Sequence, residues 1–417
     1  MAWLQAAAAH LALLALAFLC SEDRARIPWR VVAAGIGLEV ALGLALFHLP
    51  PLRAALGWAN DAAGALHRAT EAGSGFVFGY LGGAALPFAE AAPGAAYIIA
   101  FRALPMVLVI SALSALLFHW GVLQKLSAGF AWLLRRALGI GGPLALSSAV
   151  NVFVGMVEAP LLIRPYLARM PRGELFAVMA GGMAGVAGTV MVIYANFLAP
   201  LLPNAMGHIL TVSLISIPAA LAIAAIMVPW GPPEPAATAA LALDDPPTGS
   251  LDALARGAMD GLGILAGIIA LLLVSVALVA LLDAVLSLLP PIAGAPLDLQ
   301  RLFSWPFRPV MWLIGIPWAE SADAARLMAT KTVLNEFVAF RDLASLPAEA
   351  LSPQSRVILA YALCGFANFA SLGIMLGGLG AMVPARRAEI VGLGLRSILA
   401  GTLATLMCGA LAGAAFC

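Results

Sequence analysis

The chain has 417 residues, of which 63% are hydrophobic and only 10% are charged, and its formal net charge is +1. Soluble domains carry roughly 25% charged residues, so this composition excludes an ordinary soluble protein. It predicts an all-α, polytopic membrane protein, because the long unbroken apolar runs argue against the alternating strands of a β-barrel. No basic tract indicates a nucleic-acid partner.

Eight transmembrane spans are expected, because about 20 apolar residues are needed to cross the hydrocarbon core of a bilayer. The spans fall at residues 3–20, 28–49, 95–119, 174–199, 206–229, 259–289, 353–381 and 390–415. The first segment lacks a basic n-region and a small-residue cleavage site, so we interpret it as a membrane helix rather than a signal peptide.

Three stretches between these spans are neither spans nor ordinary loops: residues 51–93, 122–170 and 290–350. The apolar pieces of the second and third stretches are too short to cross singly, which is typical of re-entrant hairpins buried in protein. Only Gly231 to Asp252 has the composition of a soluble linker.

Basic residues near span ends indicate the orientation of the chain. They follow the first span, flank the first hairpin and follow the seventh span, at Arg24, Arg26, Arg30, Lys125, Arg135, Arg136, Arg164, Arg169, Arg172, Arg386 and Arg387. All of these lie on one side if both termini are periplasmic, although four arginines in longer segments do not follow the pattern. The two hairpins then enter from opposite sides, as inverted repeats predict.

Two polar interruptions set a carboxylate beside helix-breaking residues, one in each half of the chain. They are Asn151-Val-Phe-Val-Gly-Met-Val-Glu158-Ala-Pro160 and Lys331-Thr-Val-Leu-Asn335-Glu336-Phe-Val-Ala-Phe340. Ionisable groups at membrane depth are costly and by default mark a binding site or a pathway. The pair therefore predicts a transporter with broken helices and a central site.

A third segment, Tyr361 to Gly373, contains glycines that weaken a helix, and it sets Asn368 and Ser371 on one helical face. Together the three segments resemble the concentrative nucleoside transporter family. The most specific elements are Val157-Glu-Ala-Pro160, Asn335-Glu-Phe-Val338 and Gly365-Phe-Ala-Asn-Phe369 followed by Ser371. The resemblance covers nearly the whole chain.

The resemblance implies a homotrimer in a bacterial inner membrane that imports nucleosides by an elevator-like motion coupled to Na⁺ or H⁺. Each protomer would combine a scaffold with a moving transport part. Residues 1–120 would be mainly scaffold with an interfacial segment, and 257–290 a scaffold span after a polar linker at 231–256. Residues 121–230, beginning with an interfacial helix, and 291–417 would form the transport part, each with one hairpin.

The resemblance also assigns roles to residues of the three segments. Glu336, Asn368 and Ser371 match positions that bind ribose hydroxyls, and a carboxylate suits a vicinal diol because it accepts two hydrogen bonds. Phe366 matches an aromatic residue that contacts the base, and Glu158 matches the base-side carboxylate. Where family members often have Gln-Thr, this chain has Met156 and Val157. That change predicts a broadened or shifted base preference.

The resemblance places a Na⁺ site at Asn151, Val154, Gly185 and Val186, the valines through their carbonyls. Gly185 stands where a serine is usual, so one oxygen ligand of this hard cation is missing. A water could replace it, or the coupling ion could be H⁺ carried by Glu158 or Glu336. The missing ligand favours H⁺ over Na⁺.

Two other functions remain open on the sequence alone. The chain could carry another ribose-bearing or sugar-like solute, given its altered base side. A membrane-embedded hydrolase would use Glu158 and Glu336 as an acid/base pair, but no nucleophile or metal motif accompanies them. We therefore expect no enzyme activity and no cofactor other than the coupling ion.

Overall fold

The computed structural model describes residues 2–90, 96–231, 247–292 and 294–416. Within these ranges the chain is all helical, and its β-structure is limited to one isolated bridge between Ile292 and Ala295. Most of the predicted linker at 231–256 lies outside the described residues. The end of that segment is helical, because α13 (Ser250–Leu286) begins at Ser250.

Seven helical segments of the described chain are long and apolar enough to cross a membrane. They are Ala2–Leu19 (α1), Trp29–His48 (α2), Ile99–His119 (α4, Ile99–Arg102, and α5, Met106–His119), Arg172–Leu198 (α10, Arg172–Ala184, and α11, Gly188–Leu198), Ala205–Met227 (α12), Ser250–Leu286 (α13) and Pro384–Ala415 (which includes α19, Arg387–Ala415). The division into eight crossings and two re-entrant hairpins stays a prediction.

The span predicted at 353–381 is broken, as its glycines indicated, and the chain there forms two helices, α17 (Pro353–Leu363) and α18 (Phe369–Met382). Gly365 has φ +119°, a conformation that L side chains rarely adopt. The side chain of Asn368 then caps the new helix by accepting a hydrogen bond from the Ser371 N–H. Apolar composition continues through this break, so its glycines and not its hydropathy indicated it.

The break between α17 and α18 packs against the break between α10 and α11. The N–H of Phe366 donates to the carbonyl of Gly185 at 3.2 Å. A Cβ added to Gly365 would lie 2.7 Å from the carbonyl oxygen of Ala184. Buried backbone groups must find partners, and here each interrupted helix helps to satisfy the other.

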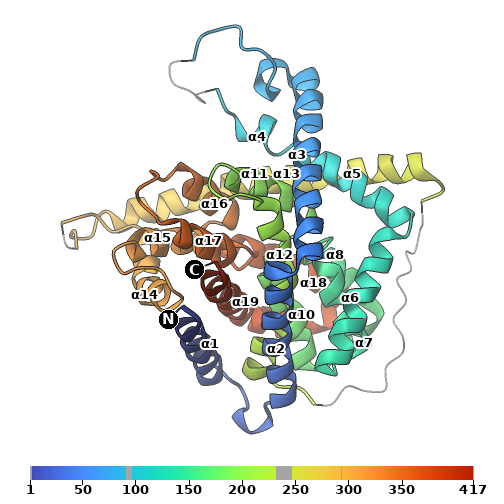
Figure 1. The fold of residues 1–417 in the computed structure, drawn as a ribbon, viewed down its shortest axis with the longest axis vertical. Helices are drawn as coiled ribbons and strands as arrows, with labels where there is room; N and C mark the ends of the chain where they lie inside the picture. Colours follow the sequence, from blue (N-terminus) through green and yellow to red (C-terminus); the bar gives the residue numbers. More distant parts are fainter. Residues whose placement is uncertain (1, 91–95, 232–246, 293, 417) are drawn as a thin grey trace.

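Two helical hairpins flank these breaks (Figure 1). In the first, α7 (Gly142–Asn151) is followed by α8 (Glu158–Leu161) and α9 (Arg164–Leu167), and in the second α15 (Ser321–Val333) is followed by α16 (Glu336–Ser345). The helix after each turn begins at a glutamate, Glu158 or Glu336. This equivalence supports an internal repeat. The turn of the first hairpin is also hydrogen-bonded to the break between α10 and α11: the Gly188 N–H donates to the Phe153 carbonyl at 3.2 Å.

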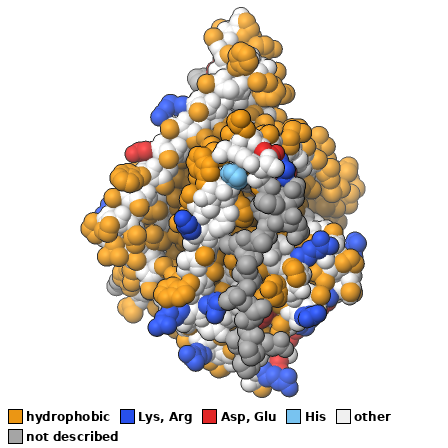
Figure 2. Space-filling model, turned by 90° about the vertical axis from the view of Figure 1, so that its right-hand side faces the viewer, with side chains coloured by type: hydrophobic (Ala, Val, Ile, Leu, Met, Phe, Trp, Pro, Cys, Tyr) orange, Lys and Arg blue, Asp and Glu red, His pale blue; other side chains and the backbone are white. Residues whose placement is uncertain are grey.

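The interior of the protein is formed by α12 and α19, whose side chains are buried along most of their lengths. By contrast, α13 packs chiefly on α5 and exposes large apolar side chains over its whole length, including Leu251, Met259, Leu273, Leu281 and Val285. Apolar side chains also cover much of the face shown in Figure 2. The remaining long segments, α3 (Pro50–Phe78), α6 (Val122–Leu138) and α14 (Leu299–Leu313), lie around this core.

A cluster of charges joins helices from both ends of the chain. Glu22, in the α1–α2 loop, accepts a hydrogen bond from Nη2 of Arg172 at 2.9 Å and also pairs with Arg396. The hydrogen bond from Arg172 lowers the pKa of the Glu22 carboxyl below its ordinary value. Glu389 of α19 pairs with the same Arg172. These ion pairs fix the α1–α2 loop to α10 and α19.

Replacing Gly365 by alanine should destabilise the protein by about 1–3 kcal/mol, because the added Cβ meets backbone at a positive φ. The thermal unfolding midpoint of the purified protein in detergent measures this loss. Gly373→Ala is the matched control: its Cβ would have nothing within 4 Å in helix α18. That change should stabilise by up to about 1 kcal/mol, and equal midpoints for both variants would contradict the expectation.

Candidate functional site

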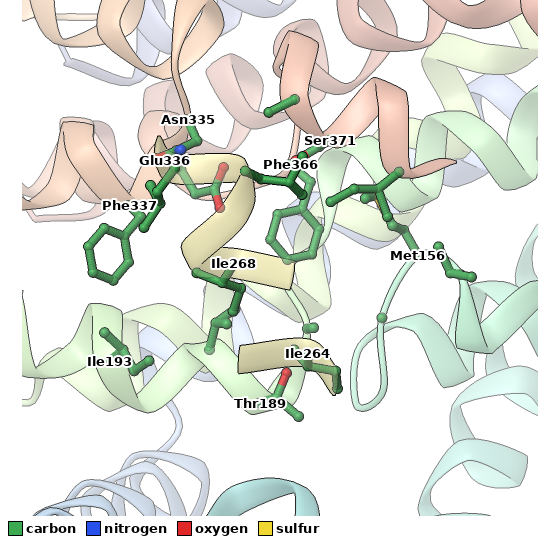
Figure 3. A pocket seen from close by; sticks show the side chains of 18 of the residues that line it. Met156, Thr189, Ile193, Ile264, Ile268, Asn335, Glu336, Phe337, Phe366 and Ser371 are labelled. Atoms are coloured by element: carbon green, nitrogen blue, oxygen red, sulfur yellow. The ribbon is translucent and has the colours of Figure 1, made fainter. Parts of the chain in front are cut away.

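A cavity of about 170 Å³ lies where the two hairpin turns and the two helix breaks converge (Figure 3). Its polar lining comes entirely from these segments and α11, at Glu158, Thr189, Tyr194, Asn335, Glu336 and Ser371. Apolar lining also comes from α13 and the segment before α5, at Leu104, Ile264, Ile268, Leu271 and Leu272. A polar solute would therefore find its partners on the hairpin, broken-helix and α11 segments and not on α13.

Glu336 is the most firmly held polar group of the cavity, and its side chain belongs to a residue only 5% exposed. The hydroxyl of Tyr194 donates to its Oε1 at 2.6 Å, and Nδ2 of Asn368 donates to its Oε2 at 2.7 Å. The ring of Tyr194 is itself stacked on Phe340, with centroids 5.0 Å apart. Both carboxylate oxygens are thus fixed before any ligand arrives.

Asn368 connects this carboxylate to the start of α18. While its amide nitrogen bonds Glu336, its Oδ1 accepts from the Ser371 N–H at 2.7 Å. Asn368 is fully buried and does not line the cavity, whereas Ser371 does. Asn335 caps α16 in the same manner through Val338, at 3.0 Å. The geometry therefore places Asn368 behind Glu336 as its support.

Lys331 lies in the interior near this carboxylate and is fully buried. Its Nζ donates to the carbonyl of Ala362 at 2.8 Å and to Oγ1 of Thr405 at 3.2 Å. Its positive charge also interacts electrostatically with Glu336. A buried charge is tolerated when it is hydrogen-bonded and opposed by a charge of opposite sign, so each of these groups lowers the cost of burying the other.

The side of the cavity predicted to contact a base is built from Met156, Val157, Glu158 and Phe366. In Figure 3, Phe366 lies between Glu336 and Met156. Met156 is buried, whereas Glu158 is exposed and also borders a second cavity of about 730 Å³. The two predicted carboxylates thus differ: one is buried and fixed, and the other faces open space.

The residues predicted for an ion site lie at the contact between the first turn and the break in α10–α11. Asn151 is buried and donates from Nδ2 to the carbonyl of Gly181 at 3.0 Å. A Cβ added to Gly185 would lie 2.5 Å from this Nδ2, so the missing side chain would point at Asn151. Val186 is buried in the break, and Val154 lines the cavity.

Tyr194, Thr189 and the α13 residues line the cavity but were not predicted from the sequence. Lys331 belongs to a predicted motif but had no predicted role. Tyr194 had a usable signal, since it is a polar interruption of the apolar run from Val190 to Leu198. The α13 residues of the cavity gave no such signal in the sequence, because an isoleucine in a span looks the same in the sequence whether it faces lipid or a cavity.

Within the described residues, helices throughout, segments long and apolar enough to cross a membrane and a half-polar cavity are the features of a solute carrier. Three protein-family models match it: "Na+ dependent nucleoside transporter N-terminus" at residues 8–81, "Nucleoside recognition" at 100–201 and "Na+ dependent nucleoside transporter C-terminus" at 208–413. The chain belongs to the concentrative nucleoside transporter family. Because this is a family of transporters and not of enzymes, the hydrolase alternative is dropped.

Relatives extend over almost the full chain. A Haemophilus influenzae protein described as an uncharacterized transporter is 34% identical, over 96% of this chain and 95% of its own length. Mouse sodium/nucleoside cotransporter 1 is 33% identical, over 96% of this chain and 62% of its own. The solved structure of CNTnw in an inward-facing substrate-bound state matches with a TM-score of 0.88 and 35% identity, covering 100% of this chain and 98% of that one.

Replacing Asn368 by alanine should cost about 2–4 kcal/mol, because it removes a helix cap and a hydrogen bond to a buried carboxylate. Asn335→Ala removes only a cap and should cost about 1 kcal/mol. Thermal unfolding of the two purified variants compares these costs. Equal losses would show that the bond from Asn368 to Glu336 contributes nothing to stability.

Proposed function

We propose that this protein imports nucleosides across a bacterial inner membrane by secondary active, cation-coupled transport. The observation that supports this most is the carboxylate of Glu336, which Tyr194 and Asn368 hold at the wall of the cavity. A vicinal diol presents two donors to a fixed carboxylate, and the ribose of a nucleoside has such a diol. Ser371 adds a hydroxyl on the same side of the cavity.

Met156 and Val157 make the base side apolar, so base recognition would depend on stacking and burial more than on hydrogen bonds. Phe366 offers an aromatic face there, and Glu158 offers the carboxylate. We infer a broadened base preference, with both purine and pyrimidine nucleosides accepted. The alternative substrate class, another ribose-bearing or sugar-like solute, would use the Glu336 side and leave the Phe366 side unused.

The one-sided polarity of the cavity supports an elevator-type mechanism. The polar contacts all come from the hairpin, broken-helix and α11 segments, whereas α13 contributes only apolar side chains such as Ile264 and Ile268. An apolar wall forms no hydrogen bonds that must break when the opposite side moves past it. CNTnw has been solved in inward-facing, intermediate and outward-facing states, which fits alternating access by such a movement.

We also propose a homotrimer, with both termini in the periplasm and the α13–α5 pair near the threefold axis. The exposed apolar side chains of α13 offer surface for neighbouring protomers or lipid. The charged cluster around Glu22 would then lie at the cytoplasmic rim, where basic residues are enriched.

The coupling ion is proposed to be H⁺ rather than Na⁺. Asn151 and Gly185 are adjacent, but glycine supplies no hydroxyl, so the candidate Na⁺ site lacks one oxygen that a hard cation requires. Relatives such as mouse sodium/nucleoside cotransporter 1 are described as sodium-coupled. In this chain, Gly185 is the feature that argues against Na⁺ as the coupling ion.

Uptake of labelled uridine and adenosine into proteoliposomes tests the function directly. We expect accumulation with an imposed pH gradient and none with a Na⁺ gradient alone. Glu336→Gln should abolish uptake, because an amide cannot accept two hydrogen bonds from a diol at both positions. Sodium-driven accumulation would reverse the ion assignment, and no uptake of either nucleoside would refute nucleoside import.

Gly185→Ser should introduce a measurable dependence of uridine uptake on Na⁺, because its hydroxyl would lie beside Asn151. Gly185→Ala is the matched control, since it brings the same Cβ contact without an oxygen. Uptake at varied Na⁺ and fixed pH separates the two variants. Sodium stimulation in both, or in neither, would contradict the view that the missing hydroxyl explains the ion preference.

A further inference from the structure

A second pair of titratable groups lies buried away from the cavity, between α1, α2 and α19. Nε2 of His10 is 3.5 Å from Oε1 of Glu39, and the two residues are 8% and 0% exposed. Neither residue lines the substrate cavity. Both lie near the middle of helices long and apolar enough to cross a membrane, so they occupy the most costly depth for a charge.

The hydrogen bonds of His10 determine where its protons are. Nδ1 lies 2.8 Å from the carbonyl oxygen of Ala6. A carbonyl can only accept, so Nδ1 must donate to it. In a neutral imidazole, Nε2 would then present a lone pair to the carboxylate. Only an additional proton, on Nε2 or on Glu39, makes this contact attractive.

Among the described residues, no positively charged group other than a protonated His10 opposes the carboxylate of Glu39. Neither oxygen of Glu39 has a hydrogen-bond partner, and Nε2 of His10 has none either. Close packing seals the site: a Cβ on Gly35 would lie 2.8 Å from the Pro218 carbonyl oxygen, and one on Gly43 would lie 2.7 Å from Leu411. An unpaired ionised carboxylate is very costly in such a place, whereas a pair that shares one proton is not.

The elements packed on α1 and α2 offer one other titratable group near the pair, the thiol of Cys408 on α19, which interacts electrostatically with Glu39. The one titratable residue of α12, His208, lies 3.1 Å from the Tyr361 hydroxyl. Arg396 and Glu389 of α19 belong to the cluster around Glu22. The remaining charged or titratable residues of these elements are exposed or partly exposed: Arg30, His48, Arg53, Asp61, His67, Arg68, Glu71, Lys125, Arg135, Arg136, Arg301, Arg308 and Arg387.

The same helix connects the pair with the substrate site. Cys408 lies one turn of α19 from Thr405, and Thr405 accepts from Nζ of the buried Lys331. Lys331 in turn interacts electrostatically with Glu336. A row of polar groups thus crosses an otherwise apolar interior, from the His10–Glu39 pair to the carboxylate of the cavity.

We propose that His10 and Glu39 together bind the coupling proton of this transporter, at a site separate from the substrate cavity. This inference rests on the proposed function and deepens it, because it assigns the coupling proton to His10 and Glu39 rather than to Glu158 or Glu336. Loading of the pair and loading of the cavity would then be linked through α19, which packs on α1 and α2 and whose Thr405 accepts a hydrogen bond from Lys331.

Proteoliposomes containing a pH-sensitive dye and no Na⁺ provide the test. Wild-type protein should acidify the lumen when labelled uridine enters. Glu39→Gln and His10→Gln should lose this uridine-dependent acidification. Glu39→Gln should still bind uridine in detergent with a Kd within about twofold of wild type, because glutamine is neutral, as the proton-loaded pair is, and Glu39 does not line the cavity.

The matched control is Glu71→Gln. His67 and Glu71 form another histidine–glutamate pair at 3.5 Å, but their side chains are 36% and 52% exposed, so this variant should acidify like wild type. Uridine entry into wild-type liposomes without acidification would overturn the inference with no variant required. Acidification retained in Glu39→Gln would overturn it as well. Absence of uridine uptake by the wild type under any gradient would refute nucleoside import, and this inference with it.

Discussion

The constraint on which the rest of this structure depends is the pairing of backbone groups where two helices are interrupted inside an apolar interior. An interrupted helix leaves N–H and C=O groups without partners, and in a bilayer no water can satisfy them. The bond from Phe366 to Gly185 and the cap provided by Asn368 remove part of that cost. Because the breaks stabilise each other, polar backbone and side-chain groups can converge at one place.

Burial of charge follows the same logic. Glu336 is tolerated because two donors and the charge of Lys331 compensate it, and Lys331 because a carbonyl and a hydroxyl accept its protons. These contacts link α11, the second hairpin, α18 and α19. The groups that would bind a solute are therefore also groups that hold the helices together.

Glu158 and Glu336 could be selected as site candidates from the sequence, because each stands beside helix breakers in an apolar chain, and both line the cavity. It could not place Asn368 behind Glu336, nor pair Tyr194 with that carboxylate, since both depend on contacts between distant segments. The break within 353–381 was indicated by its glycines and not by its apolar length. Glu39 was detectable in principle as a lone carboxylate in an apolar span, but its partner His10 is 29 positions away.

The apolar wall that α13 presents to the cavity has a pharmacological consequence. Ile264 and Ile268 face the space that a substrate would occupy but offer it no directional contact. With the ribose bound at Glu336, as proposed, a nucleoside extended by a short hydrocarbon group would bury that group against the wall. Such a compound would bridge the two sides and hold them together, so that it would act as a competitive inhibitor and not as cargo.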